Sequence, residues 1–199
     1  MRIKYNPTHI FTETMKLKYR MMIPSIVIII GSFLANFYIE TSMLRWLAAT
    51  ALLMYFIVFW TFRLRRLVPP EEPNALLSPV CGKVKAVEEH PTETVIVIRK
   101  SMFDPADVRS ALDGERPADP STLRSESGDM SWRVVSGKLH LLDSRPGLQG
   151  RLVGVFAFSG ECRVTVSKQW KVEVAPGAPV LAGETVLART ETSQKEDQQ

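Results

Sequence analysis

Cysteine is scarce in this chain. Only Cys81 and Cys162 occur among its 199 residues, which excludes a network of disulfides and any metal site built from four cysteines. So low a count is typical of a protein in a reducing compartment. None of the three histidines, at positions 9, 90 and 140, has metal-ligand spacing with either cysteine, so we expect no bound metal ion.

Motifs of several functional classes are also missing. Gly82 and Lys83 are not part of a GxxxxGK[ST] loop, so the chain has no P-loop nucleotide site. Ser159 lies outside any GxSxG pattern, which excludes the nucleophile elbow of an α/β-hydrolase. No lysine stands in a lipoyl-type turn, so we do not expect a swinging-arm carrier either.

Charged residues are absent from two stretches in the first third of the chain, 21–39 and 46–62. Each comes close to the roughly 20 residues that a helix needs to cross a hydrocarbon core about 30 Å thick. Trp46, Trp60 and Phe62 stand near the ends of the second stretch, where membrane proteins carry aromatic belts. We therefore expect two transmembrane helices in an antiparallel hairpin, because only a short turn separates them.

Two other interpretations of these stretches fit the sequence less well. A cleaved signal peptide has a shorter apolar run, and a small-residue cleavage site follows it, which is missing here. A buried hairpin in the core of a soluble protein needs a larger domain around it than the remaining residues provide.

Basic residues flank the hairpin on one side. They are Arg2, Lys4, Lys16, Lys18 and Arg20 before it and Arg63, Arg65 and Arg66 after it, whereas the turn holds only Arg45. By the positive-inside rule, this asymmetry predicts an integral membrane protein with both termini and its soluble domain in the cytoplasm, at the inner membrane if the source is bacterial. Anionic lipid, rather than nucleic acid, then explains the net charge of +4.

Turn residues break up the rest of the chain. Proline and acidic residues in segment 67–75 predict an extended linker. Beyond it, short apolar or alternating runs between turn residues are typical of β-strands. We expect strands at Gly82-Lys83, 95–98, 134–135, 152–158, 164–166, 172–174 and 186–187, and one helical turn after Pro105. Residues 113–130 have almost no apolar side chains, which predicts a surface loop.

The predicted fold class is therefore mostly β, with an N-terminal transmembrane helical hairpin and one cytoplasmic domain of about seven or eight short strands. The predicted organisation is a basic N-terminal segment, the hairpin, a proline-rich linker, the β domain and a disordered tail, at 1–20, 21–66, 67–75, 76–190 and 191–199.

Four segments occur in an order that points to one family. They are Phe62-Arg63 with Pro69-Pro70 and SPVCGKV (78–84), ETVIVIRKSMFDPADVRS (93–110), LVGVFAFSGECRVTV (152–166) and VAPGAPVLAGETVLA (174–188). They resemble the FFRDP, PP and SPADGKV, the FMSPLDVHVN, the FGLIRFGSRVDVYLP, and the PEG and AGETVIA segments of the short, membrane-anchored phosphatidylserine decarboxylases. SPxxGKV and AGETVLA also occur in barrel-sandwich modules, but their order beside a two-helix anchor strengthens the resemblance.

The resemblance implies a barrel-sandwich-type β domain and a decarboxylation that depends on self-cleavage of the chain. In the family, a serine attacks the preceding glycine carbonyl, and chain cleavage leaves a pyruvoyl group that forms a Schiff base with the lipid headgroup. An aspartate and a histidine assist that cleavage. Here Cys81 matches the aspartate and Arg109 the histidine, and a guanidinium does not release its proton. Ser159 matches the glycine, counted forward from Phe158, and Cys162 matches the serine, counted back from Arg163.

These replacements predict a non-catalytic, phosphatidylserine-decarboxylase-like membrane protein without a cofactor. It would bind membrane lipids, with Arg63, Arg65, Arg66 and Arg109 as the headgroup candidates, or act as a structural subunit with a membrane-protein partner. The alternative is an active, pyruvoyl-dependent decarboxylase that cleaves near Glu161-Cys162, with the cysteine performing the acyl shift. Two interpretations of the cysteines stay open, namely buried structural side chains and a redox-sensitive thiol pair.

Overall fold

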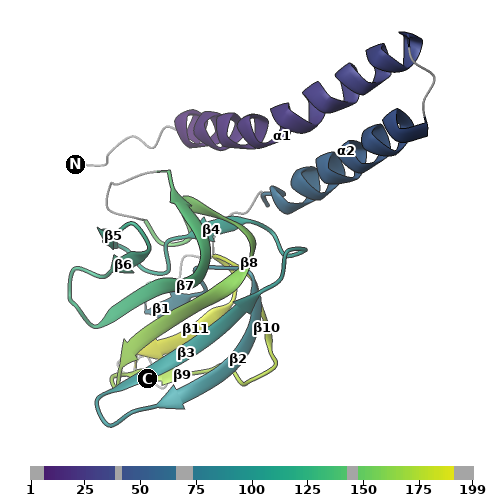
Figure 1. Cartoon of the computed structure of the whole chain (residues 1–199). Helices are drawn as coiled ribbons and strands as arrows, with labels where there is room; N and C mark the ends of the chain where they lie inside the picture. Colours follow the sequence, from purple (N-terminus) through teal and green to yellow (C-terminus); the bar gives the residue numbers. More distant parts are fainter. Residues whose placement is uncertain (1–6, 39–41, 66–73, 143–147, 191–199) are drawn as a thin grey trace. The chain divides into compact units, whose positions relative to one another are not determined.

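A computed structural model describes residues 7–38, 42–65, 74–142 and 148–190. The chain divides into two compact units, Met1–Arg63 and Leu64–Gln199. The first holds two helices and the second holds all the strands (Figure 1). The predicted linker at 67–75 and the tail at 191–199 fall almost entirely outside the described residues.

The first unit is a helical hairpin made of α1 (Pro7–Tyr38) and α2 (Ser42–Thr61). Both contain a window long and apolar enough to cross a membrane, Met15–Asn36 and Ser42–Thr61. Large apolar side chains on both helices, such as Phe33 and Trp46, are exposed, so the hairpin does not bury its apolar surface within itself. The prediction of two long apolar helices is confirmed, although α1 begins well before residue 21 because its basic residues are also good helix formers.

The second unit, called the β body below, contains two antiparallel sheets. The small sheet has the order β1 (Ala75–Leu77), β11 (Val186–Thr190) and β9 (Trp170–Val172). The large sheet has the order β10 (Pro179–Val180), β2 (Gly82–Glu89), β3 (Glu93–Lys100), β8 (Leu152–Ser167), β7 (Met130–Leu141), β6 (Thr122–Arg124) and β5 (Arg116–Asp119), and β4 (Asp107–Arg109) pairs with β8 outside this path. The mostly β fold class is confirmed at this level.

One hydrophobic core joins the two sheets. Leu76 and Leu187 from the small sheet pack with Ile96, Trp132 and Phe156 from the large one. The β-branched run in β3 is buried on both faces, because β2 and β8 flank the strand while core side chains cover it. This position explains why that run is continuously apolar rather than alternating.

Several local predictions were wrong. Residues 113–130 contain the hairpin of β5 and β6 instead of a loop, because β6 pairs with β7 at the sheet edge and an edge strand gains backbone hydrogen bonds without apolar side chains. The chain after Pro105 forms strand β4 instead of a helical turn, since pairing with β8 decides its conformation.

Strand β8 also differs from its prediction. The two strands expected at 152–158 and 164–166 are one long strand. It bends at Phe158, whose φ of 62° lies in the left-handed region. The polar residues that suggested a break therefore mark a bend, and the described residues contain more strands than the seven or eight expected.

Candidate functional site

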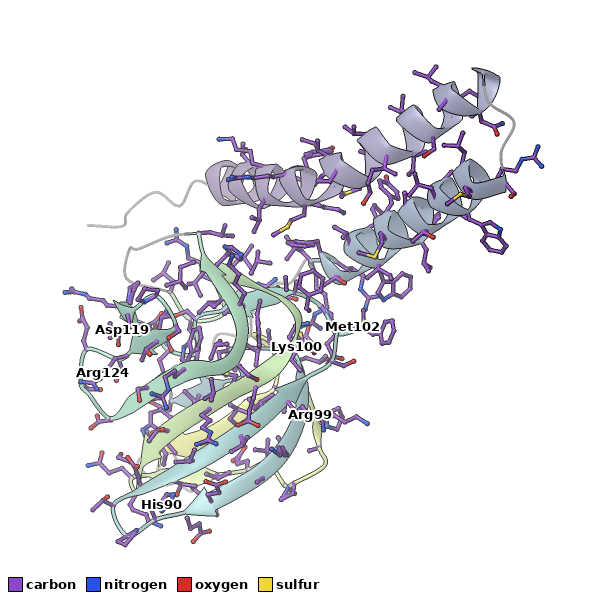
Figure 2. All side chains as sticks on the ribbon, viewed as in Figure 1. His90, Arg99, Lys100, Met102, Asp119 and Arg124 are labelled. Carbon is purple, nitrogen blue, oxygen red and sulfur yellow. The ribbon has the colours of Figure 1, made fainter. Side chains whose placement is uncertain are left out.

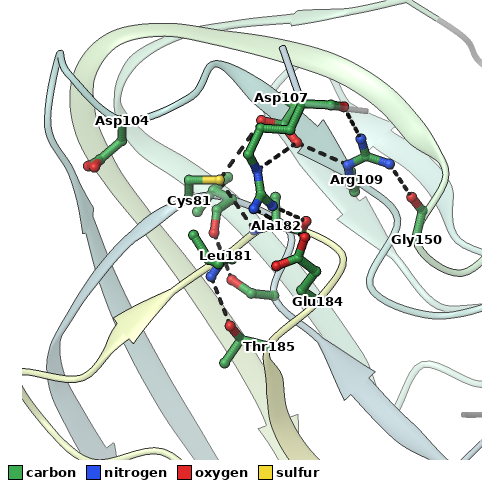
Figure 3. Close-up of polar contacts among 12 residues, drawn as sticks. Cys81, Asp104, Asp107, Arg109, Gly150, Leu181, Ala182, Glu184 and Thr185 are labelled. Carbon is green, nitrogen blue, oxygen red and sulfur yellow. Dashed lines mark hydrogen bonds and ion pairs between the residues drawn. The ribbon is translucent and has the colours of Figure 1, made fainter. Parts of the chain in front are cut away.

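Three of the family-like segments meet at one end of the β body. Cys81 follows Val80, which bridges to Val108 in β4, while Asp107 and Arg109 are two residues apart in β4 and so share one face of that strand. The Cys81 thiol lies 3.9 Å from Asp107 Oδ1, and Arg109 Nε donates to Asp107 Oδ2 at 3.0 Å (Figure 3). We call Arg65, Cys81, Asp107, Arg109 and Glu184 the charged cluster.

All the hydrogen bonds described for the Arg109 guanidinium go to groups within the protein. Besides Asp107, it donates through Nη1 to the Gly150 carbonyl at 2.9 Å and through Nη2 to the Arg65 carbonyl at 2.8 Å. Its exposed fraction is 6%, and that of Asp107 is 0%. A guanidinium this buried, with bonds in three directions, acts as a structural crosslink between β4, the segment that enters the β body and the turn at Gly150.

Arg65 completes the charged cluster from the segment that enters the β body. Its Nη1 pairs with Glu184 at 3.2 Å and its Nη2 donates to the Ala182 carbonyl at 3.0 Å. The Ala182 amide in turn donates to Cys81 Sγ at 3.3 Å. The AGET turn, the SPVCGKV segment and Arg65 are therefore linked (Figure 3).

The other headgroup candidates lie elsewhere. Arg63 is exposed in the first unit, with its guanidinium 5.3 Å from the Trp60 ring centroid. Arg66 lies outside the described residues.

The two cysteines are free, buried and in different surroundings. Burial raises the pKa of the Cys81 thiol to about 11, and the Asp107 charge adds to this effect. Burial also raises the pKa of Cys162, whose exposed fraction is 0%. In the sheet register Cys162 stands opposite Ile98 and Val134. Both thiols are therefore protonated at neutral pH. A cysteine acts as a nucleophile only as a thiolate.

Ser159 and Glu161 line a separate hollow of about 400 Å³ beside the bend of β8. The remaining lining residues are Lys85, Arg99, Lys100, Ser136 and Gly160. Position 160 requires glycine, because an added Cβ would collide with the Ser136 carbonyl and the Phe156 ring. We call this hollow the basic hollow. The residues that match the family's site therefore lie in two places: Ser159 and Glu161 line the basic hollow, whereas Cys81 and Arg109 belong to the charged cluster.

Positive charge dominates the basic hollow. Glu161, its one acidic residue, accepts from Lys85 at 3.1 Å and from Arg163 at 3.2 Å, and the hydrogen bond from Lys85 lowers the Glu161 pKa. The Arg99 side chain is exposed, and its guanidinium forms no hydrogen bond or ion pair with any residue that the structure describes. Figure 2 shows Arg99 and Lys100 next to each other at one end of β3. The hollow thus offers a guanidinium to an anion.

Lys100 is a buried residue that sequence reasoning missed. Its exposed fraction is 1%, and its ammonium donates to the carbonyls of Ser101, Asp104 and Phe158 at 3.1, 2.9 and 3.0 Å. Burial lowers the Lys100 pKa, while Asp104 acts in the opposite direction. No sequence signal separates this lysine from a surface residue, because its three acceptors are backbone groups.

Glu115 is the second buried charged residue that was missed. It accepts hydrogen bonds from the amides of Ala111 and Leu112, both at 3.0 Å, from the Ser110 hydroxyl at 3.1 Å and from Trp132 Nε1 at 3.2 Å. Its exposed fraction is 0%. Burial raises the Glu115 pKa to about 7.

This pKa predicts a pH-dependent stability. The unfolded chain releases the Glu115 proton near pH 4.5, whereas the folded protein keeps it to about pH 7. Stability is therefore expected to fall as the pH rises between these values, by about 2 kcal/mol from pH 5 to 7, and then to level off. Thermal unfolding of the detergent-solubilised chain at several pH values measures the effect. In Glu115→Gln this part of the pH dependence should disappear, and an unchanged profile would rule out Glu115 as its origin.

Among the described residues, no three histidine, cysteine, aspartate or glutamate side chains are grouped so that they could hold a metal ion. Comparisons of the chain with protein-family models, with curated proteins and with solved structures find no match. The resemblance to the decarboxylases therefore depends on the sequence motifs alone.

Proposed function

We propose that this chain is a non-catalytic, phosphatidylserine-decarboxylase-like integral membrane protein that binds phospholipid headgroups. The single observation that carries the proposal is the basic hollow, in which the Arg99 guanidinium has no acidic partner among the described residues. A lipid phosphate is the anion that a membrane protein meets at the highest local concentration, and arginine binds phosphate through charge-assisted hydrogen bonds.

The apolar hairpin supports the membrane location. Its helices have the length and composition of membrane spans, and the basic residues on either side favour a cytoplasmic β body. The meeting of three family-like segments around the charged cluster is what we would expect of a barrel-sandwich domain related to the decarboxylases, because motifs far apart in a sequence converge when they form one site.

The surroundings of the replaced residues favour a protein without decarboxylase activity. Arg109 and Asp107 neutralise each other in a buried pair. Cys162, the residue that would perform the acyl shift, is a fully buried thiol whose pKa is raised by that burial. A fully buried thiol that stays protonated is a poor nucleophile.

Intact-mass measurement of the purified full chain distinguishes the proposal from the active-decarboxylase alternative. A single species of 22.4 kDa is expected. Cleavage near Cys162 would instead give fragments of roughly 18 and 4 kDa, the smaller with a pyruvoyl terminus, and would contradict a non-catalytic role.

Lipid binding is tested on the full chain in mild detergent, with phosphatidylglycerol retention measured by native mass spectrometry. Arg99→Ala is expected to weaken retention by on the order of tenfold, equivalent to about 1.4 kcal/mol. Arg133→Ala is the matched control, because Arg133 is also exposed on a long strand and forms no ion pair with a described residue. Equal retention by the two variants would contradict the basic hollow as the headgroup site.

A further inference from the structure

Two exposed aromatic side chains come from neighbouring segments of the β body. Phe103, in the turn between β3 and β4, is 66% exposed, and Phe158, at the bend of β8, is 40% exposed. The same strand buries Phe156 completely, so the β body has a core that accepts phenylalanine. Large apolar side chains that gather outside such a core mark a surface that contacts an apolar partner.

The buried Lys100 ammonium holds both segments in place. It donates to the carbonyls of Ser101 and Asp104, which flank Phe103 in the turn, and to the carbonyl of Phe158 itself. Phe158 also keeps a left-handed backbone, which is unfavourable for a residue with a bulky side chain. The two aromatic residues are therefore presented by a fixed scaffold.

Basic side chains accompany the aromatic pair. Arg99 directly precedes Lys100, and Lys138 in β7 stands opposite Ala157, the neighbour of Phe158. Both are exposed, and neither forms an ion pair with any residue in the described part of the chain. Asp104 is the acidic residue of the turn, and its Oδ2 accepts from the Ser101 amide at 2.7 Å. Aromatic residues next to unpaired cations are typical of surfaces that bind anionic bilayers.

We propose that Phe103 and Phe158 form an aromatic wedge that enters the headgroup region of an anionic bilayer, while Arg99 and Lys138 contact lipid phosphates. The inference deepens the proposed function and rests on its membrane location. The covalent connection supports it, because only a few residues follow α2 before Arg65 joins the charged cluster. A bilayer that holds α2 is therefore within reach of the β body.

A fluorescent label at position 103 tests the wedge in the full chain. Phe103→Cys carries an environment-sensitive nitrobenzoxadiazole label, and the buried native thiols Cys81 and Cys162 limit background labelling. The control is His90→Cys, since Figure 2 shows His90 in the β2–β3 hairpin, at the opposite end of β3 from Lys100. Both are reconstituted into vesicles of phosphatidylcholine alone or with an equal amount of phosphatidylglycerol.

We expect the label at position 103 to emit at shorter wavelength in the anionic vesicles, and a lipid-borne quencher to remove roughly half or more of its emission. The label at position 90 should keep its emission in both vesicles. Exchange of Arg99 and Lys138 for serine should abolish the difference between the two vesicle types while the chain stays membrane-bound.

A label at position 103 that remains in water, like the one at position 90, overturns the wedge even if lipid retention still depends on Arg99. Quenching at position 103 without Arg99-dependent retention supports insertion of the aromatic side chains, but it overturns Arg99 as a phosphate contact and the basic hollow as a headgroup site. The two proposals therefore fail separately.

Discussion

Arg109→Met is expected to lower the free energy of unfolding by about 3–5 kcal/mol, since the carboxylate of the fully buried Asp107 loses its partner at 3.0 Å and keeps only Arg65 Nε, at 3.9 Å. The Gly150 and Arg65 carbonyls lose their donors as well. The sequence resemblance to the decarboxylases matches Arg109 to a histidine that assists cleavage. In this chain we infer that Arg109 stabilises the fold instead. Chemical denaturation of the full chain in detergent, followed by near-ultraviolet circular dichroism, gives the free energy.

Two further variants separate a lost charge pair from a lost side chain. Asp107→Leu combined with Arg109→Met removes both charges, so it should cost less than Arg109→Met alone. Arg133→Met, at an exposed position, should stay within about 0.5 kcal/mol of the original protein. If Arg109→Met were as harmless as Arg133→Met, the charged cluster would not be the crosslink that we infer.

Glu115→Ala is expected to cost about 3 kcal/mol or more. Four donors, from the Ser110 hydroxyl, the amides of Ala111 and Leu112, and Trp132 Nε1, lose their common acceptor. Each buried donor without a partner costs about 1–3 kcal/mol, and the deleted side chain leaves a cavity. The loss should persist at pH 5, where Glu115 is protonated, because the amides still need an acceptor.

The neighbouring hairpin provides a control for this variant. Glu126 pairs with Arg116 at the surface and is 55% exposed, so Glu126→Ala should cost less than about 1 kcal/mol. Trp132 fluorescence reports on the Glu115 site directly, because its indole loses a charged acceptor. A Glu115→Ala protein with unchanged stability and unchanged Trp132 emission would show that the four donors have other acceptors.

Sequence alone determined the features that depend on local composition. The two apolar helices follow from long stretches without charge, since a single charged residue inside either would disfavour a membrane span. Strand β3 follows from its β-branched run, whose stiff side chains favour an extended backbone.

Tertiary structure decided whatever depends on partners distant in the chain. The polar segment 113–130 forms strands because β7 offers its edge. Lys100 and Glu115 look like surface residues in the sequence, yet both are buried, because the backbone and side-chain groups that satisfy them are assembled only by folding. Arg109 became a crosslink for the same reason: its guanidinium binds groups from residues 65, 107 and 150. Burial and hydrogen bonding depend on the whole fold, whereas hydropathy and charge are local properties that can be read along the chain.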